Sequence, residues 1–148
     1  MNTTQTLQQM QQLRLVGMYQ AYRSQLELPM DQQLEGHDLV AHLLQSEELN
    51  RVNEKTAYYL KLAKLRLPAT VEQIECSAAR NLTKQQLATL AEGRYLQQGE
   101  NILITGATGC GKSFLACALG HQACLQGYKT AYLNMNRLIE KVTLSKLD

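Results

Sequence analysis

The feature that most limits how this chain can fold is a glycine-rich segment at residues 106–113, which reads Gly-Ala-Thr-Gly-Cys-Gly-Lys-Ser. It matches the phosphate-binding P-loop pattern, G-x-x-x-x-G-K-[ST], at every fixed position. Glycines allow the backbone to curl so that its N–H groups point inward at phosphate oxygens. The helix that follows such a loop offers its positive N-terminal end to the same anion. The segment therefore predicts both a ligand and a local fold.

The side chains of this segment predict a nucleotide site that holds magnesium. Lys112 is expected to reach the β- and γ-phosphates and is the candidate catalytic residue, while the Ser113 hydroxyl is the candidate Mg²⁺ ligand. Cys110 either fills a tolerated position or, when it carries a bulky adduct, blocks the nucleotide. The predicted cofactors are ATP and Mg²⁺. The predicted cofactor-binding residues are Gly106, Ala107, Thr108, Gly109, Cys110, Gly111, Lys112, Ser113 and Phe114.

The residues around the loop predict an α/β fold. Residues 101–105 form a short apolar run with β-branched side chains between two glycines, which is typical of a buried strand. A helix is expected over 112–126, a second strand over 130–134 and a second helix over 137–144. This βαβα order is the start of an α/β domain with a parallel sheet.

The rest of the chain predicts helices. Apolar residues recur at helical spacing from Leu7, with a break expected near Gly17 and a stop at Pro29. A second helical stretch is expected from Leu39 toward Pro68, followed by shorter helices with a possible break at Gly93. The predicted domains are a helical N-terminal domain at 1–68, a helical linker at 69–98 and the first part of a P-loop domain at 99–148.

Charge and hydropathy exclude several classes of protein. The formal net charge of +2 over 148 residues is typical neither of a disordered chain nor of bulk-charge binding to nucleic acid. No apolar run approaches the roughly 20 residues that span a bilayer, so no membrane partner is expected. The first residues resemble no signal peptide, and we therefore expect a cytoplasmic protein.

The charges are distributed unevenly. Residues 27–48 contain six acids and neither Lys nor Arg, whereas residues 51–66 contain five bases and one acid, with two tyrosines between them. This basic stretch predicts either contact with DNA phosphates or a solvated helix face that balances the acidic stretch. The candidate DNA-binding residues are Arg51, Lys55, Lys61, Lys64 and Arg66.

Several segments together resemble the IstB/DnaC group of AAA+ ATPases. Residues 101–116 and 118–120 are similar to its P-loop region, and residues 13–18, Leu-Arg-Leu-Val-Gly-Met, resemble the L-x-L-x-G-M signature of IstB-type helper proteins. Residues 51–65 resemble their basic helix. The resemblance implies a helical N-terminal domain and an AAA+ domain. It also implies ATP binding, assembly as a homo-oligomer on DNA, and delivery of target DNA to an IstA-type transposase.

The chain departs from this family in two ways. Ser113 and Phe114 stand where many relatives have Thr-His, and Ser can replace Thr as a Mg²⁺ ligand. The chain also ends at Asp148, before the region where the family places its Walker B acids, sensors and arginine finger. We therefore expect a truncated protein, with hydrolysis only in the full-length form. In AAA+ sheets the first two strands are not neighbours, so residues 101–105 and 130–134 are not expected to pair.

The leading interpretation is an IstB-like, ATP-dependent DNA-binding adaptor, and three alternatives stay open at this point. A DnaC-like helicase loader shares the P-loop and differs in its partner. A P-loop small-molecule kinase is disfavoured by the long helical region that precedes the loop. The last alternative is a helical DNA- or protein-interaction module with a non-hydrolysing ATPase remnant.

Overall fold

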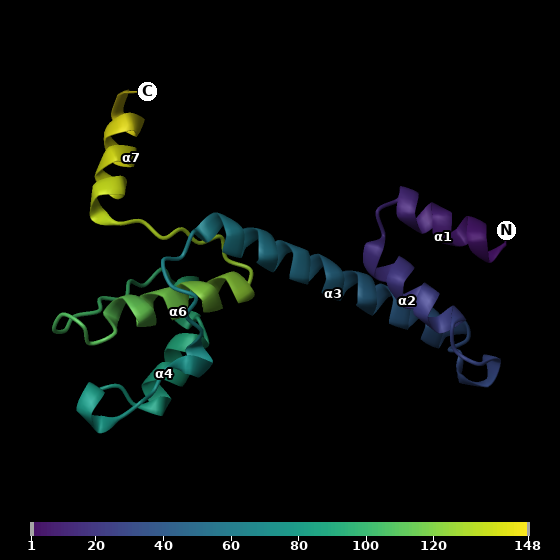
Figure 1. The fold of residues 1–148 in the computed structure, drawn as a ribbon, viewed down its shortest axis with the longest axis horizontal. Helices are drawn as coiled ribbons and strands as arrows, with labels where there is room; N and C mark the ends of the chain where they lie inside the picture. Colours follow the sequence, from purple (N-terminus) through teal and green to yellow (C-terminus); the bar gives the residue numbers. More distant parts are fainter. Residues whose placement is uncertain (1, 148) are drawn as a thin grey trace. The chain divides into compact units, whose positions relative to one another are not determined.

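The structure, a computed structural model, describes residues 2–147 and forms two compact units. The first unit ends at Lys55 and the second begins at Thr56. The long helix α3 (Gly36–Ala63) crosses this boundary (Figure 1). Within residues 2–147, no helix combines the length and the apolar character needed to span a bilayer.

The first unit contains α1 (Thr3–Gln12), α2 (Val16–Leu26), the short 3₁₀ helix η1 (Met30–Gln32) and the first part of α3. A capping box starts α1: the Asn2 side chain accepts the backbone N–H of Gln5 at 2.9 Å, and the Gln5 side chain accepts that of Asn2 at 3.1 Å. Arg14, with a φ of 57°, turns the chain from α1 into α2.

The break predicted near Gly17 lies instead at residues 13–15, and Gly17 is a buried residue in the first turn of α2. A Cβ atom at Gly17 would collide with the backbone oxygen of Ser46 and lie 2.7 Å from the Cα of Glu47. The residue is therefore small because α2 packs directly on the backbone of α3. Gly17 therefore marks a close contact between two helices. Sequence rules that treat glycine as a helix breaker do not distinguish such a contact from a break.

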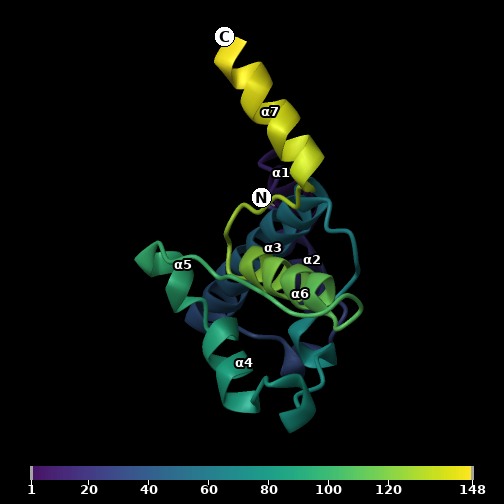
Figure 2. The same ribbon diagram turned by 90° about the vertical axis from the view of Figure 1, so that its left-hand side faces the viewer.

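The second unit holds the end of α3 and the elements that follow it (Figure 2). These are η2 (Val71–Gln73), η3 (Ala78–Arg80), α4 (Lys84–Ala91), α5 (Arg94–Gln98), α6 (Lys112–Leu125) and α7 (Met135–Leu147). The core forms around α6, whose Cys117 and Ala118 are fully buried against Ala69. Leu65, Ile74 and Phe114 are among the apolar side chains that pack on this cluster.

The C-terminal end of α6 is fixed to the turn between α4 and α5. The side-chain amide of Gln126 donates to the backbone oxygen of Ala91 at 2.7 Å. Gly93, the predicted break, separates the two helices with a φ of 77°, and a Cβ there would collide with the Gln126 side chain. Gly127 follows α6 with a φ of 89°, the left-handed conformation in which glycine commonly ends a helix.

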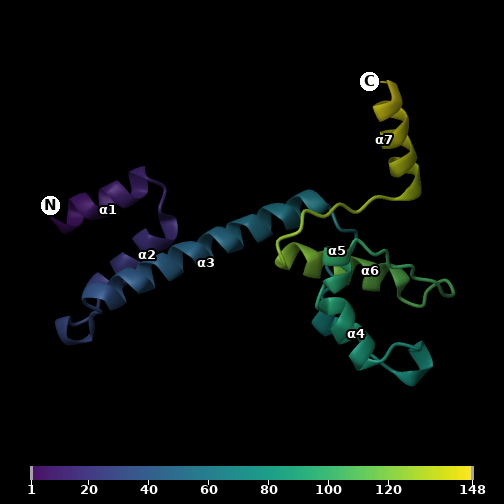
Figure 3. The same cartoon turned by 180° about the vertical axis from the view of Figure 1, so that it is seen from behind.

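The predicted βαβα start of a parallel sheet is wrong for this structure, because residues 2–147 contain helices and no strand. Residues 101–105 and 130–134 lie as irregular connections before and after α6 (Figure 3). A strand exists only where a neighbour completes its ladder of hydrogen bonds, and these two segments do not pair with each other. Instead, the backbone N–H of Tyr132 donates to the oxygen of Ala63 at 2.8 Å, at the end of α3. Leu103 consequently remains 89% exposed.

Candidate nucleotide-binding site

The candidate site is the turn at residues 106–111, which leads directly into α6. Gly109 and Gly111 have φ angles of 81° and 93°, a region that side chains with a Cβ rarely adopt. Gly111 precedes the first helical residue, Lys112, and its backbone oxygen accepts the N–H of Leu115 at 3.0 Å. The turn therefore joins the positive end of α6, where the backbone N–H groups have no partner within the helix.

Lys112 turns back over the loop that precedes it. Its ammonium group donates to the backbone oxygens of Gly106 and Ala107, the second at 2.9 Å. The backbone N–H of Cys110 donates to the same oxygen of Ala107 at 3.3 Å. Lys112 and Cys110 thus close the loop on itself through hydrogen bonds to its backbone oxygens.

The thiol of Cys110 is exposed and lies against Gly106. A Cβ built on Gly106 would lie 2.7 Å from the Cys110 Sγ, so a larger residue at position 106 would require the Cys110 side chain to rotate away. Gly106 has no left-handed φ, so its backbone conformation does not require glycine.

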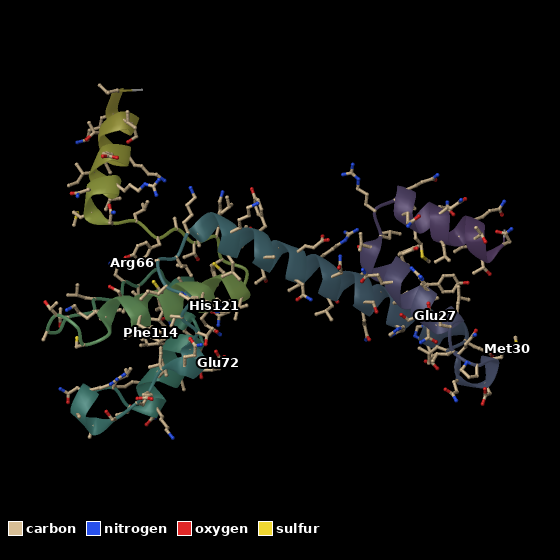
Figure 4. All side chains as sticks on the ribbon, in the orientation of Figure 1. Glu27, Met30, Arg66, Glu72, Phe114 and His121 are labelled. Atoms are coloured by element: carbon tan, nitrogen blue, oxygen red, sulfur yellow. The ribbon has the colours of Figure 1, made fainter. Side chains whose placement is uncertain are left out.

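A cavity of about 600 Å³ opens beside the loop. Its floor is formed by Gly109, Cys110 and Gly111 together with Phe114 and Leu115 of α6. Figure 4 shows Phe114 on this helix. Its opposite wall comes from the connection that contains η2 and η3, through the residues Gln73, Ile74, Glu75, Ala79, Arg80 and Leu82.

This opposite wall is anchored to α6. Ile74 packs on the core cluster around Cys117, and η2 lies against α6. The side chain of Gln73 accepts the backbone N–H of Thr70 at 3.2 Å, in a capping box that starts η2. The wall therefore has a defined position beside the P-loop.

The structure brings four of the predicted cofactor-binding residues to the cavity: Gly109, Cys110, Gly111 and Phe114. Gly106, Ala107 and Lys112 meet through the lysine hydrogen bonds, and Ser113 is exposed in the first turn of α6. Sequence reasoning missed the wall at residues 73–82, more than 20 positions before the loop in the chain. No spacing rule links that segment to the P-loop, because only tertiary packing on α6 brings the two together.

The candidate DNA-binding residues occur in both units. Arg51 donates through its Nε to the buried Glu47 at 3.0 Å, so its charge is already partly matched. Lys61, Lys64 and Arg66 are exposed at the end of α3 and just beyond it, where Figure 4 labels Arg66. Lys64 ends the helix with a φ of 49°.

The chain is similar to known proteins over nearly its whole length. Residues 8–148 match the family described as IstB-like ATP binding protein. The chain is 40% identical over 149 residues to a protein of insertion sequence IS1162 from Pseudomonas fluorescens that is named for ATP binding. The match covers 100% of this chain and 64% of that protein.

Two insertion-sequence proteins of Sinorhizobium fredii, also named for ATP binding, are similar as well. The protein y4uH is 37% identical over 93% of this chain and 55% of its own length, and y4pL is 32% identical over 97% and 58%. The chain thus spans about 64% or less of these relatives. Because the family match covers nearly all of its length, this chain belongs to the IstB-like ATP-binding protein family.

Proposed function

We propose that this chain binds Mg-ATP at residues 106–114 and serves as an ATP-binding helper of DNA transposition in the cytoplasm. In this role it is an adaptor that delivers target DNA to a transposase, and it works as a homo-oligomer in the longer form that the relatives have. The observation that carries the proposal is the cavity beside the P-loop. Two glycines with positive φ, Gly109 and Gly111, line this cavity and lead into α6, whose first residue is Lys112.

The residues fit a nucleoside triphosphate in chemistry and in size. The glycines leave room for phosphate oxygens close to the backbone, and α6 directs its positive end at them. A cavity of about 600 Å³ falls within the range of small-molecule and cofactor sites. Phe114, Ile74 and Leu82 supply apolar surface for a flat base beyond the phosphates.

Two side chains have distinct roles in this proposal. Lys112 releases the oxygens of Gly106 and Ala107 and moves to the β- and γ-phosphates, where its charge is matched by full negative charges. The exposed hydroxyl of Ser113 becomes a ligand of the Mg²⁺ that accompanies ATP.

The proposed partners follow from family membership and from charge. The names of the relatives, which are insertion-sequence proteins, support a role in transposition, so a transposase is the proposed protein partner. Lys61, Lys64 and Arg66 provide three exposed positive charges within a short stretch of the second unit, which suits contact with DNA phosphates. Arg51 and Lys55 are the further candidates, in the first unit.

The test is isothermal titration calorimetry of the 148-residue chain with ATP in the presence of Mg²⁺. We expect saturable binding that Lys112→Ala weakens at least tenfold, because the variant loses the cation that meets the terminal phosphates. Lys141→Ala, which removes an exposed lysine of α7, is the matched control and should bind as the unchanged chain does. If the chain keeps its helical circular dichroism but binds no ATP, the proposed function is wrong.

A further inference from the structure

The cavity beside the P-loop has a charged pair on the wall opposite the loop. Arg80 and Glu75 both line the cavity, and the guanidinium of Arg80 lies 4.0 Å from the carboxylate of Glu75. Within the described part of the chain, Arg80 is the only cationic side chain that lines this cavity, and Glu75 is the only carboxylate. Neither residue belongs to the P-loop pattern.

The pair is weak enough to be exchanged. The two side chains are 55% and 86% exposed, and their separation is at the outer limit of an ion pair. Exposed pairs of this kind contribute little to stability, because water screens the charges and both side chains lose freedom when they meet. A ligand with fixed negative charge, or with a flat aromatic face, can therefore draw Arg80 away from Glu75.

The position of the pair indicates which end of a nucleotide it meets. Lys112 and Ser113, the residues proposed for the terminal phosphates and Mg²⁺, do not line this cavity, whereas Gly109, Gly111 and Phe114 do. The cavity extends past Phe114 to the segment that carries Arg80. The base, the ribose and the α-phosphate are the parts of the nucleotide that extend in this direction.

We propose that Arg80 is a nucleotide-binding residue outside the P-loop, which holds the base-and-ribose end of ATP, and that Glu75 competes with the nucleotide for it. This inference rests on the proposed binding of ATP. Arg80 supplies a planar cation that stacks on a base or pairs with the α-phosphate. Glu75 keeps the Arg80 guanidinium at the cavity, and this ion pair must break before Arg80 can contact the nucleotide. The Glu75 carboxylate also repels the negative phosphates.

Position 80 is held by local backbone structure. Arg80 ends η3, and Asn81, with a φ of 52°, turns the chain so that Leu82 reaches the cavity as well. Arg80 is exposed and contributes nothing to the apolar core, so its removal leaves the fold intact. Substitutions of Arg80 and Glu75 therefore report on ligand binding.

The experiment is calorimetric titration of the full chain and its variants with Mg-ATP and, separately, Mg-ADP. Arg80→Ala is expected to weaken both nucleotides by about five- to tenfold and to a similar extent, because the parts that it contacts are common to them. Glu75→Gln is expected to bind both about twofold more tightly. Lys112→Ala should lose more affinity for ATP than for ADP, since its partners include the γ-phosphate.

Two matched controls accompany these variants. Arg94→Ala removes an exposed arginine of α5, and Glu72→Gln removes an exposed carboxylate of η2; neither residue lines the cavity. Affinity for Arg80→Ala within twofold of the unchanged chain, together with a Lys112→Ala variant that loses binding, overturns the inference alone. A loss confined to ATP also overturns it, because Arg80 would then act on the terminal phosphate. Absence of binding by the unchanged, folded chain overturns the proposed function as well.

Discussion

The carboxylate of Glu47 accepts a hydrogen bond from the backbone N–H of Met18 at 3.0 Å, and this bond joins the middle of α3 to the first turn of α2. The N–H groups at the start of a helix have no partner within it, so Glu47 acts as a cap supplied from another helix. The neighbouring Gly17 brings the two backbones close enough for this bond. The Gly-Met pair of the L-x-L-x-G-M pattern thus has a structural explanation in the first unit.

The environment of Glu47 predicts how the first unit responds to acid. Its bond to the Met18 N–H, reinforced by Arg51, lowers the pKa of the Glu47 carboxyl from its ordinary value, although burial opposes this shift. A carboxyl with a lowered folded pKa stabilises the fold above its unfolded pKa, and this contribution is lost as the pH falls through the folded value. We expect amide exchange in α2 to accelerate as the pH falls below the ordinary Glu pKa of about 4.3, measured by mass spectrometry with correction for the intrinsic rates.

Glu47→Gln is the variant that tests this assignment, because it keeps the shape of the side chain and removes the titrating proton. Its acceleration of exchange over the same pH range should be clearly smaller. Glu48→Gln, an exposed neighbour on the same helix, should behave as the unchanged chain does. An equal response in the Glu47 and Glu48 variants would contradict the role of this carboxylate.

Gly17→Ala is expected to separate α2 from α3. The added Cβ meets backbone atoms of Ser46 and Glu47, which cannot rotate away as a side chain would. Overpacking of this kind costs about 1–3 kcal/mol, and here it should also break the bond between Glu47 and Met18. Thermal denaturation of the full chain, followed by circular dichroism, measures the loss. Ser24→Ala, at an exposed position of α2, is the control, and equal stability of the two variants would refute the prediction.

Alkylation of Cys110 should block ATP and should be slowed by it. The thiol is exposed and lines the cavity, whereas Cys117 and Cys124 are fully buried. Mass spectrometry after treatment with N-ethylmaleimide should therefore find the label at Cys110 well before it appears at the buried pair, and Mg-ATP should reduce that labelling. The half-buried Cys76 lies outside the lining of this cavity and serves as the internal reference. Labelled protein that binds ATP with unchanged affinity would count against the prediction.

Charge reversal of Lys61 and Lys64 tests the proposed contact with DNA. Each cation that neutralises a phosphate releases counterions, so its loss reduces the dependence of affinity on salt concentration. We expect the double variant Lys61→Glu, Lys64→Glu to weaken binding to duplex DNA at least tenfold. The slope of log affinity against log salt concentration should decrease by the contribution of about two phosphate contacts. Lys141→Glu together with Lys146→Glu, on α7, is the control of equal charge. Fluorescence anisotropy at several salt concentrations provides the measurement, and an unchanged slope would exclude the first pair from the interface.

The helices that begin or end at chemically distinctive residues could be predicted from the sequence. Gly93 and Gly127 mark real ends, and Lys112 begins a helix as the P-loop pattern requires. The strands could not be predicted in the same way. The β-branched residues at 101–105 favour an extended backbone, but a strand forms only when a neighbouring strand provides hydrogen bonds. The role of Gly17 could not be predicted either, because the sequence does not distinguish a glycine that permits close helix contact from one that breaks a helix.

Only the part of the candidate site whose residues are close together in the sequence, the P-loop, could be predicted. The glycines and the lysine of the loop act through spacing along the chain, so the pattern finds them. The wall with Arg80 and Glu75 is created by the packing of Ile74 on α6, and that contact has no signature in the order of residues. Arg80 appears in the sequence as an ordinary surface arginine.

The bonds from Lys112 to the oxygens of Gly106 and Ala107 also bear on selectivity among anions. Any anion that enters the loop must first displace an internal cation from two carbonyl groups, so binding is an exchange of partners. A single orthophosphate or sulfate ion offers little in return, whereas a polyphosphate can occupy the lysine, the helix terminus and Mg²⁺ together. If the loop binds ATP as proposed, we therefore expect it to prefer a polyphosphate chelated to Mg²⁺ to simple inorganic anions.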